Sequence, residues 1–175
     1  MAESPDPFAG KLFNEFPPQA PYGSNEKYQA HLLDQYKLYV EMTDRISARR
    51  QSANSFFLAI NTGLVGLIGY VTIKDTSDYL WLVAGVGIVL SYLWYRLIRS
   101  YRDLNTGKFK VIHFIETRLP LSPYDAEWEA IGRGEDPKLY KPFTHIEMGV
   151  PWVFVLLHAI VFFRMFPWAT LRSWF

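Results

Sequence analysis

The chain has 175 residues, a formal net charge of +1 and no cysteine. The lack of cysteine excludes disulfides and thiol chemistry, and it fits a protein that faces a reducing compartment. Half of the residues are apolar, an ordinary average that hides a division into long uncharged runs and polar segments.

Residues 1–24 are expected to form an extended arm. Five prolines lie before Gly23 among several aromatic residues, and proline opposes helix formation. The first ten residues, MAESPDPFAG, are acidic and lack the basic and apolar regions of a signal peptide. The arm is then either a disordered tail or a segment that docks on a neighbouring subunit through its aromatic side chains.

A helix is predicted from Asn25 onward. A seam of side chains recurs at alternating four- and three-residue steps, as in a helix that packs along another: Leu32, Tyr36, Tyr39, Thr43 and Ile46. No proline or glycine intervenes before Gly63, so the polar helix at residues 25–50 is expected to continue into the membrane. At helical rise it would project about 39 Å.

Three uncharged runs point to membrane spans. Residues 51–73 would cover about 34 Å as a helix, against a hydrocarbon core of roughly 30 Å. Residues 79–95 and the run that starts at Met148 are shorter, at about 24–26 Å, but arginines at their ends can extend them. We predict transmembrane helices at 51–73 and 79–95, and at 148–171 either a third span or a re-entrant helix.

Small residues in the first span predict a packing surface. Ala59, Gly63, Gly66 and Gly69 let helix backbones approach closely in lipid, either between the first two spans or between subunits. A flexible glycine stretch that faces lipid is the alternative. A phosphate-binding loop is rejected because no strand precedes these glycines and no Lys-Ser/Thr ending follows them.

Polar residues inside the spans are the candidate functional residues. Asn54, Asn61 and Thr62 would form a polar belt along a pore, or the two asparagines would hydrogen-bond a neighbouring helix. His158 is the only histidine within an apolar run. It is either a pH-sensing group or a neutral imidazole that packs in the core.

Basic residues set the predicted orientation. Arg49 and Arg50 precede the first span, whereas Arg96, Arg99 and Arg102 follow the second. The positive-inside rule then places the N-terminus in the cytoplasm, and these arginines would contact lipid headgroups. That explanation is preferred over nucleic-acid binding, so membrane lipids are predicted partners and nucleic acid is not.

Residues 96–147 are expected to form a helical cytoplasmic segment. A helix would continue to Leu119, with a break at Asn105–Gly107, and Pro120 would end it. Ser122 is placed to cap a short helix over residues 123–131, which Gly132 would close.

No pattern in the chain predicts an enzyme, a cofactor or a metal site. His145, Glu147 and Pro151 resemble part of a zinc deaminase motif, but the cysteines that the motif needs are missing. The four histidines are scattered, and Glu127 and Glu129 point apart on the expected helix.

Three long strings carry a family resemblance: DQYKLYVEMTDRISARRQSANSFFLAINT, SYRDLNTGKFKVIHFIETRLP and AEWEAIGRGEDPKLYKPFTHIEMGVPWVF. They resemble the RipA-like family of small octameric bacterial membrane proteins, from about Tyr28 to the third uncharged run. The resemblance implies an all-helical inner-membrane protein that assembles as a ring-like homo-octamer. It implies no defined chemistry and no catalytic residues.

Two functional classes follow from these expectations. The octamer would be a pore or channel-like assembly, or a membrane-anchored scaffold that presents a cytoplasmic ring of helices to protein partners. A pore requires a polar or small-residue face along its lining helix, which the first span offers only in part.

Overall fold

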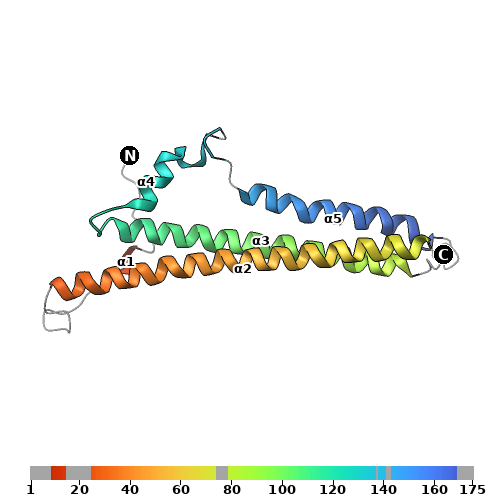
Figure 1. Ribbon diagram of the computed structural model, residues 1–175, viewed down its shortest axis with the longest axis horizontal. Coiled ribbons are helices and arrows are strands. Elements are labelled where there is room, and N and C mark those ends of the chain that lie inside the picture. Colours follow the sequence, from red (N-terminus) through yellow and green to blue (C-terminus); the bar gives the residue numbers. More distant parts are fainter. Residues whose placement is uncertain (1–8, 15–24, 74–78, 137, 141–142, 169–175) are drawn as a thin grey trace.

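The computed structural model describes residues 9–14, 25–73, 79–136, 138–140 and 143–168. Its elements are α1 (Ala9–Leu12), α2 (Asn25–Ile73), α3 (Leu80–Glu116), α4 (Pro123–Ala130), the 3-10 turn η1 (Gly132–Gly134) and α5 (Phe143–Met165). These residues contain no strand, which confirms the predicted all-α class. Figure 1 shows α2 and α3 as long neighbouring rods, with α5 beside α3.

One seam of buried and half-buried side chains runs along almost all of α2. Beyond Ile46 it takes two consecutive four-residue steps, to Arg50 and Asn54, and then resumes the alternation of three and four residues at Phe57, Asn61, Leu64, Ile68 and Val71. Helix α2 is a single helix of 49 residues, about 74 Å long. Its seam faces one partner helix along this length.

The partner helix α3 carries the matching seam. Its buried and half-buried positions also alternate by four and three residues: Leu80, Ala84, Gly87, Ser91, Trp94, Ile98, Tyr101, Asn105, Lys108, Ile112 and Ile115. The two helices therefore pack as an antiparallel coiled-coil pair that extends from the apolar segment into the polar one. At the apolar end, the buried core residues Ile68, Leu80 and Ala84 join partly buried residues of α5 such as Val161 and Phe162.

The predicted break at Asn105–Gly107 is wrong. Helix α3 runs through these residues without interruption, and the Thr106 hydroxyl donates to the Arg102 carbonyl oxygen over 3.0 Å. A glycine within a helix costs only about 1 kcal/mol relative to alanine. Beside this glycine, the Lys108 ammonium lies 4.3 Å from the centroid of the Tyr39 ring, and this contact between α3 and α2 offsets part of that cost.

The arm is not uniformly extended, because residues 9–12 form one helical turn. No proline lies between Phe8 and Phe16, so the local sequence permits this turn. The Phe13 ring packs against Phe114 with centroids 5.8 Å apart, and the Arg118 guanidinium lies 3.9 Å from the Phe13 centroid. The described part of the arm therefore docks on its own chain. The other residues of the predicted arm lie outside the described residues.

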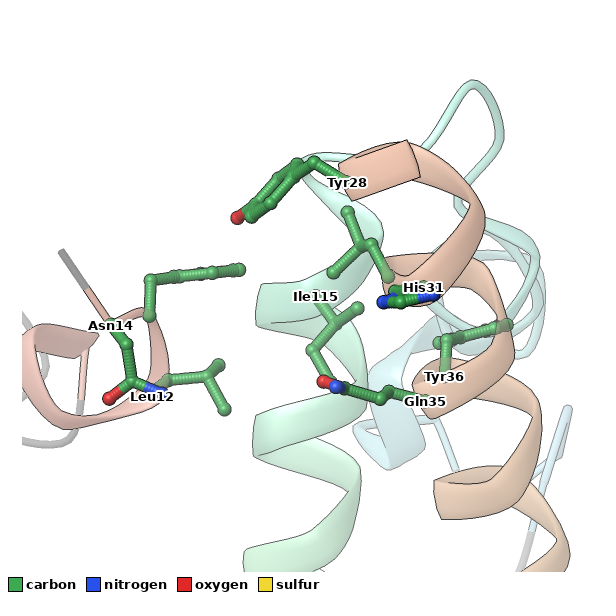
Figure 2. A pocket seen from close by; sticks show the side chains of 9 residues that line it. Leu12, Asn14, Tyr28, His31, Gln35, Tyr36 and Ile115 are labelled. Atoms are coloured by element: carbon green, nitrogen blue, oxygen red, sulfur yellow. The ribbon is translucent and has the colours of Figure 1, made fainter. Parts of the chain in front are cut away.

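A small cavity of about 90 Å³ separates this docked turn from the helix pair. Figure 2 shows Leu12 and Asn14 on one side of it, with Tyr28, His31 and Gln35 of α2 and Ile115 of α3 on the other.

The sequence predicts that Ser122 caps the N-terminus of α4, but this prediction is wrong. Glu116 caps it instead. Ser122 makes no capping hydrogen bond, and its hydroxyl lies 3.4 Å from the Glu116 carbonyl oxygen. The fully buried Glu116 carboxylate accepts hydrogen bonds from the backbone N–H groups of Tyr124 and Asp125, both at 3.1 Å. It also accepts the Tyr36 hydroxyl at 2.7 Å. Burial, and then the hydrogen bond to Glu116, raise the pKa of Tyr36, so this hydroxyl stays a donor at neutral pH.

One carboxylate thus joins three elements. It ends α3, satisfies helix-start donors of α4 that would otherwise lack acceptors, and ties both to α2. After Ala130 the chain leaves the helix through Gly132, whose φ of 68° lies in the left-handed region that glycine adopts without a steric penalty.

Candidate functional site

Three fully buried polar side chains meet where the apolar segments of the three long helices pack. We call Asn61 of α2, Ser91 of α3 and His158 of α5 the polar junction; all three have no exposed surface. The Ser91 hydroxyl lies 2.8 Å from Asn61 Oδ1 and 2.8 Å from the Gly87 carbonyl oxygen. His158 Nε2 lies 3.2 Å from Asn61 Oδ1, and Asn61 Nδ2 donates to the Phe57 carbonyl oxygen over 2.9 Å.

Gly87 makes room for the junction. A Cβ atom at this position would lie 2.5 Å from three atoms of the His158 ring, much closer than atoms can approach. The glycine therefore lets the imidazole lie directly against the backbone of α3. This close approach brings α5 within reach of Asn61 on α2 and links all three helices.

The hydrogen bonds indicate how His158 is protonated. Asn61 Oδ1 accepts only, so Nε2 carries the hydrogen in this contact. Nδ1 is buried and has no hydrogen-bond partner among the described residues. A hydrogen on Nδ1 would add a buried donor and a charge without a partner, so the neutral imidazole matches the geometry. The junction is suited to joining helices rather than to proton transfer, which would need a continuing chain of partners.

A second polar group lies one heptad away along α2, at the border of the apolar segment. We call Arg50, Asn54, Trp94 and Glu147 the border cluster. Trp94 Nε1 donates to Asn54 Oδ1 over 2.8 Å, and Asn54 Nδ2 donates to Glu147 Oε1 over 3.2 Å. Arg50 Nε lies 3.7 Å from Glu147 Oε2, which is a charge interaction and not a hydrogen bond.

The border cluster repeats the arrangement of the polar junction with other residue types. It again joins all three long helices, with two residues from α2 and one each from α3 and α5, and the Arg50 and Glu147 side chains are only 22% and 12% exposed. A charged pair so poorly exposed interacts more strongly than one in water. The cluster therefore pins the start of the apolar part of α5 to α2 and α3.

Several of these residues were not among the predicted site residues: Gly87, Ser91, Trp94 and Glu147. A signal for part of the set exists in the sequence. Arg50 and Glu147 both stand immediately before apolar runs, so their positions at one membrane border could have been matched. Nothing in the local sequence marks Ser91 or Gly87 as partners of His158.

The predicted polar belt divides between two faces of α2. Asn54 and Asn61 lie on the seam and bind neighbouring helices within one chain, whereas Thr62 is exposed. Asn61 does not lie on the outer surface of the protomer, because Ser91 and His158 enclose it.

The predicted small-residue stripe lies on the opposite, exposed face of α2. A Cβ atom at Gly63, Gly66 or Gly69 would meet nothing within 4 Å, and Ala59 is also exposed. The stripe therefore does not form the contact between the first two spans, since the seam at Asn61, Leu64 and Ile68 makes that contact. Its alternative role, contact between subunits, stays a prediction.

Four of the five predicted headgroup residues remain at the surface near the border cluster: Arg49, Arg96, Arg99 and Arg102. Arg50 instead turns inward to Glu147. Within the described ranges, no group of three His, Asp or Glu side chains is placed to hold a metal ion.

The fold and its polar contacts define a helical integral membrane protein. Helices α2 and α3, together with Ile146–Met165 of α5, are long and apolar enough to cross a bilayer. The chain belongs to the octameric membrane protein family (8xMP), whose model matches residues 33–167. This finding confirms the octameric family predicted from the resemblance. Searches of curated proteins and of solved structures found no match.

Replacement of Gly87 by alanine tests the polar junction. Because the added methyl group would overlap the His158 ring, we expect a loss of roughly 1–3 kcal/mol in the free energy of unfolding. Gly107→Ala in the same helix is the matched control, since a Cβ there meets nothing within 4 Å and alanine is favoured in a helix by about 1 kcal/mol. Thermal unfolding of the purified protein in mild detergent measures both. Equal effects of the two variants would show that His158 does not lie against Gly87.

Proposed function

We propose that the octamer is a membrane-anchored scaffold that presents a ring of paired helices to protein partners. The observation that carries this proposal is the direction of the polar side chains. Asn54, Asn61, Ser91 and His158 are all engaged within one protomer. The exposed side of the same segments is largely apolar, with large side chains such as Phe56, Leu67, Val86, Leu93, Trp152, Leu156 and Phe163.

This distribution disfavours the pore, because a water-filled pathway needs polar groups or charges along its lining. The exposed surface of the described spans offers mainly apolar side chains, with the small residues of α2 and hydroxyls such as Thr62 as exceptions. A scaffold needs only a stable anchor and an extended surface. The polar halves of α2 and α3 supply that surface, and residues 25–50 of α2 alone extend about 39 Å.

The proposal places the extramembrane helices in the cytoplasm of a bacterium, with the spans in its inner membrane. Arg49, Arg96, Arg99 and Arg102 are exposed at the same end of the spans, which fits the positive-inside bias and contact with anionic headgroups. The proposal assigns the protein no catalytic activity, cofactor or nucleic-acid partner.

Single cysteines test this orientation, because the natural chain has none. Lys37 and Tyr79 are exposed at opposite ends of the helix pair. In intact spheroplasts of an expressing bacterium, a membrane-impermeant maleimide should label Tyr79→Cys, and it should label Lys37→Cys only after permeabilisation. The reverse pattern would place the extramembrane helices outside the cell.

The small-residue stripe is the surface that we propose for contact between neighbouring subunits. Gly66→Leu fills open space on the exposed face of α2, so a close helix contact there would be lost. We expect light scattering in mild detergent to show a mass below that of the octamer. Gly149→Leu, at an equally open glycine of α5, is the control. An unchanged octamer mass for Gly66→Leu would move the interface elsewhere.

Flux measurements test the scaffold against the pore. Wild-type octamers in liposomes should pass potassium, chloride and small dyes no faster than protein-free liposomes, because Asn61, Ser91 and His158 are enclosed within the protomer. Gramicidin provides the positive control for potassium. Saturable flux that Asn61→Leu changes in an intact octamer would contradict the proposal and restore the channel.

A further inference from the structure

The extramembrane part of the chain contains a cleft of about 540 Å³ between α3 and α4. The cleft is lined by Phe109 and Lys110 of α3 and by Tyr124, Glu127 and Trp128 of α4. The volume falls within the range of roughly 300–1,000 Å³ that is usual for small-molecule sites. The polar junction and the border cluster do not contribute to this cleft.

Aromatic rings form most of the cleft wall. Phe109 packs edge-on against Tyr124 with centroids 5.7 Å apart, and Trp128 packs edge-on against Tyr140 with centroids 6.4 Å apart. Gly134 supports the indole from behind, since a Cβ atom there would lie 3.1 Å from the Trp128 ring. Rings fixed in this way favour a flat apolar ligand, against which they pack by face or by edge.

Two opposite charges face the cleft from different helices. Lys110 belongs to α3 and Glu127 to α4, and neither forms an ion pair with any described residue. The His113 imidazole also lines the cleft, 6.3 Å from the Phe109 ring between centroids. A ligand that carries only one charge would pair with either Lys110 or Glu127 and would leave the other side chain without a partner. A ligand with both an anionic and a cationic group would match both.

The position of the cleft excludes a lipid as the natural occupant. Lys110 follows Arg96 by fourteen residues along α3, which corresponds to about 21 Å of helix beyond the membrane border. The interfacial layer on each side of a bilayer is only about 5–8 Å deep. The occupant must therefore come from the aqueous phase.

We propose that this cleft binds a zwitterionic aromatic solute, of which a free aromatic amino acid is the simplest example. Lys110 would pair with the carboxylate of the ligand and Glu127 with its ammonium group. Trp128 and Tyr140 would hold the ring. The site is independent of the scaffold proposal, because it requires neither a protein partner nor any property of the spans.

Isothermal titration of the octamer in nanodiscs with three probes tests this assignment. L-Phenylalanine carries both charges, 3-phenylpropionate only the negative one, and 2-phenylethylamine only the positive one. We expect phenylalanine to bind at least about tenfold more tightly than either single-charge probe, since each charge-assisted hydrogen bond contributes about that factor. Lys110→Met should weaken phenylalanine and phenylpropionate about tenfold and leave phenylethylamine unchanged. Glu127→Gln should weaken phenylalanine and phenylethylamine and leave phenylpropionate unchanged.

Lys37→Met and Glu129→Gln are the matched controls, because both residues are exposed and lie outside the cleft lining. They should bind all three probes as the wild type does. Glu→Gln preserves the length of the side chain and Lys→Met keeps most of it, and circular dichroism verifies the helical content of each variant. The proposal is overturned if none of the probes gives a saturable heat, if the single-charge probes bind as tightly as phenylalanine, or if the Lys110 and Glu127 variants bind like their controls.

Discussion

The structure depends on the seam between α2 and α3, which runs without interruption through two different solvents. In the extramembrane half, burial of side chains such as Leu32 and Ile112 is favoured because it removes apolar surface from water. In lipid this gain vanishes, because the hydrocarbon tails are as apolar as the side chains. The same seam positions then carry hydrogen-bonding residues, and the polar junction and the border cluster supply attractions that burial does not provide there.

This constraint also explains the place of α5. The third helix has little extramembrane contact of its own, and it meets the pair through Glu147 at the border cluster and His158 at the junction. Gly87 permits the close approach that the histidine requires. The polar junction and the border cluster make their hydrogen bonds inside the protomer. The surface that remains for neighbouring copies or lipid is largely apolar, and along one stripe of α2 its side chains are small. The residues of the polar junction and the border cluster therefore stabilise the protomer itself.

The sequence predicted the long helices well, because unbroken runs and regular spacing are local signals. It also indicated that Asn54 and Asn61 share a face, but the seam at Leu32–Ile46, continued by heptads, reaches positions 53 and 60 and misses both asparagines by one residue. The partners of these residues were beyond prediction, because Ser91, His158 and Glu147 come from distant segments whose registers only the packed helices define. The capping of α4 by Glu116 was missed for the same reason. Ser122 satisfied the local rule, but a buried carboxylate from the preceding helix lay closer to the free N–H groups.

Thiol accessibility at position 61 tests the central claim most directly, that the polar junction is sealed within each protomer. Asn61→Cys would carry the only thiol of the chain, and Lys37→Cys provides an exposed reference. In intact octamers in liposomes that are permeable to the reagent, a small charged methanethiosulfonate should modify the cysteine at position 37 rapidly. It should leave the cysteine at position 61 unmodified until the protein is unfolded. Rapid modification at position 61 in the folded octamer would show that water reaches this layer and would contradict the account.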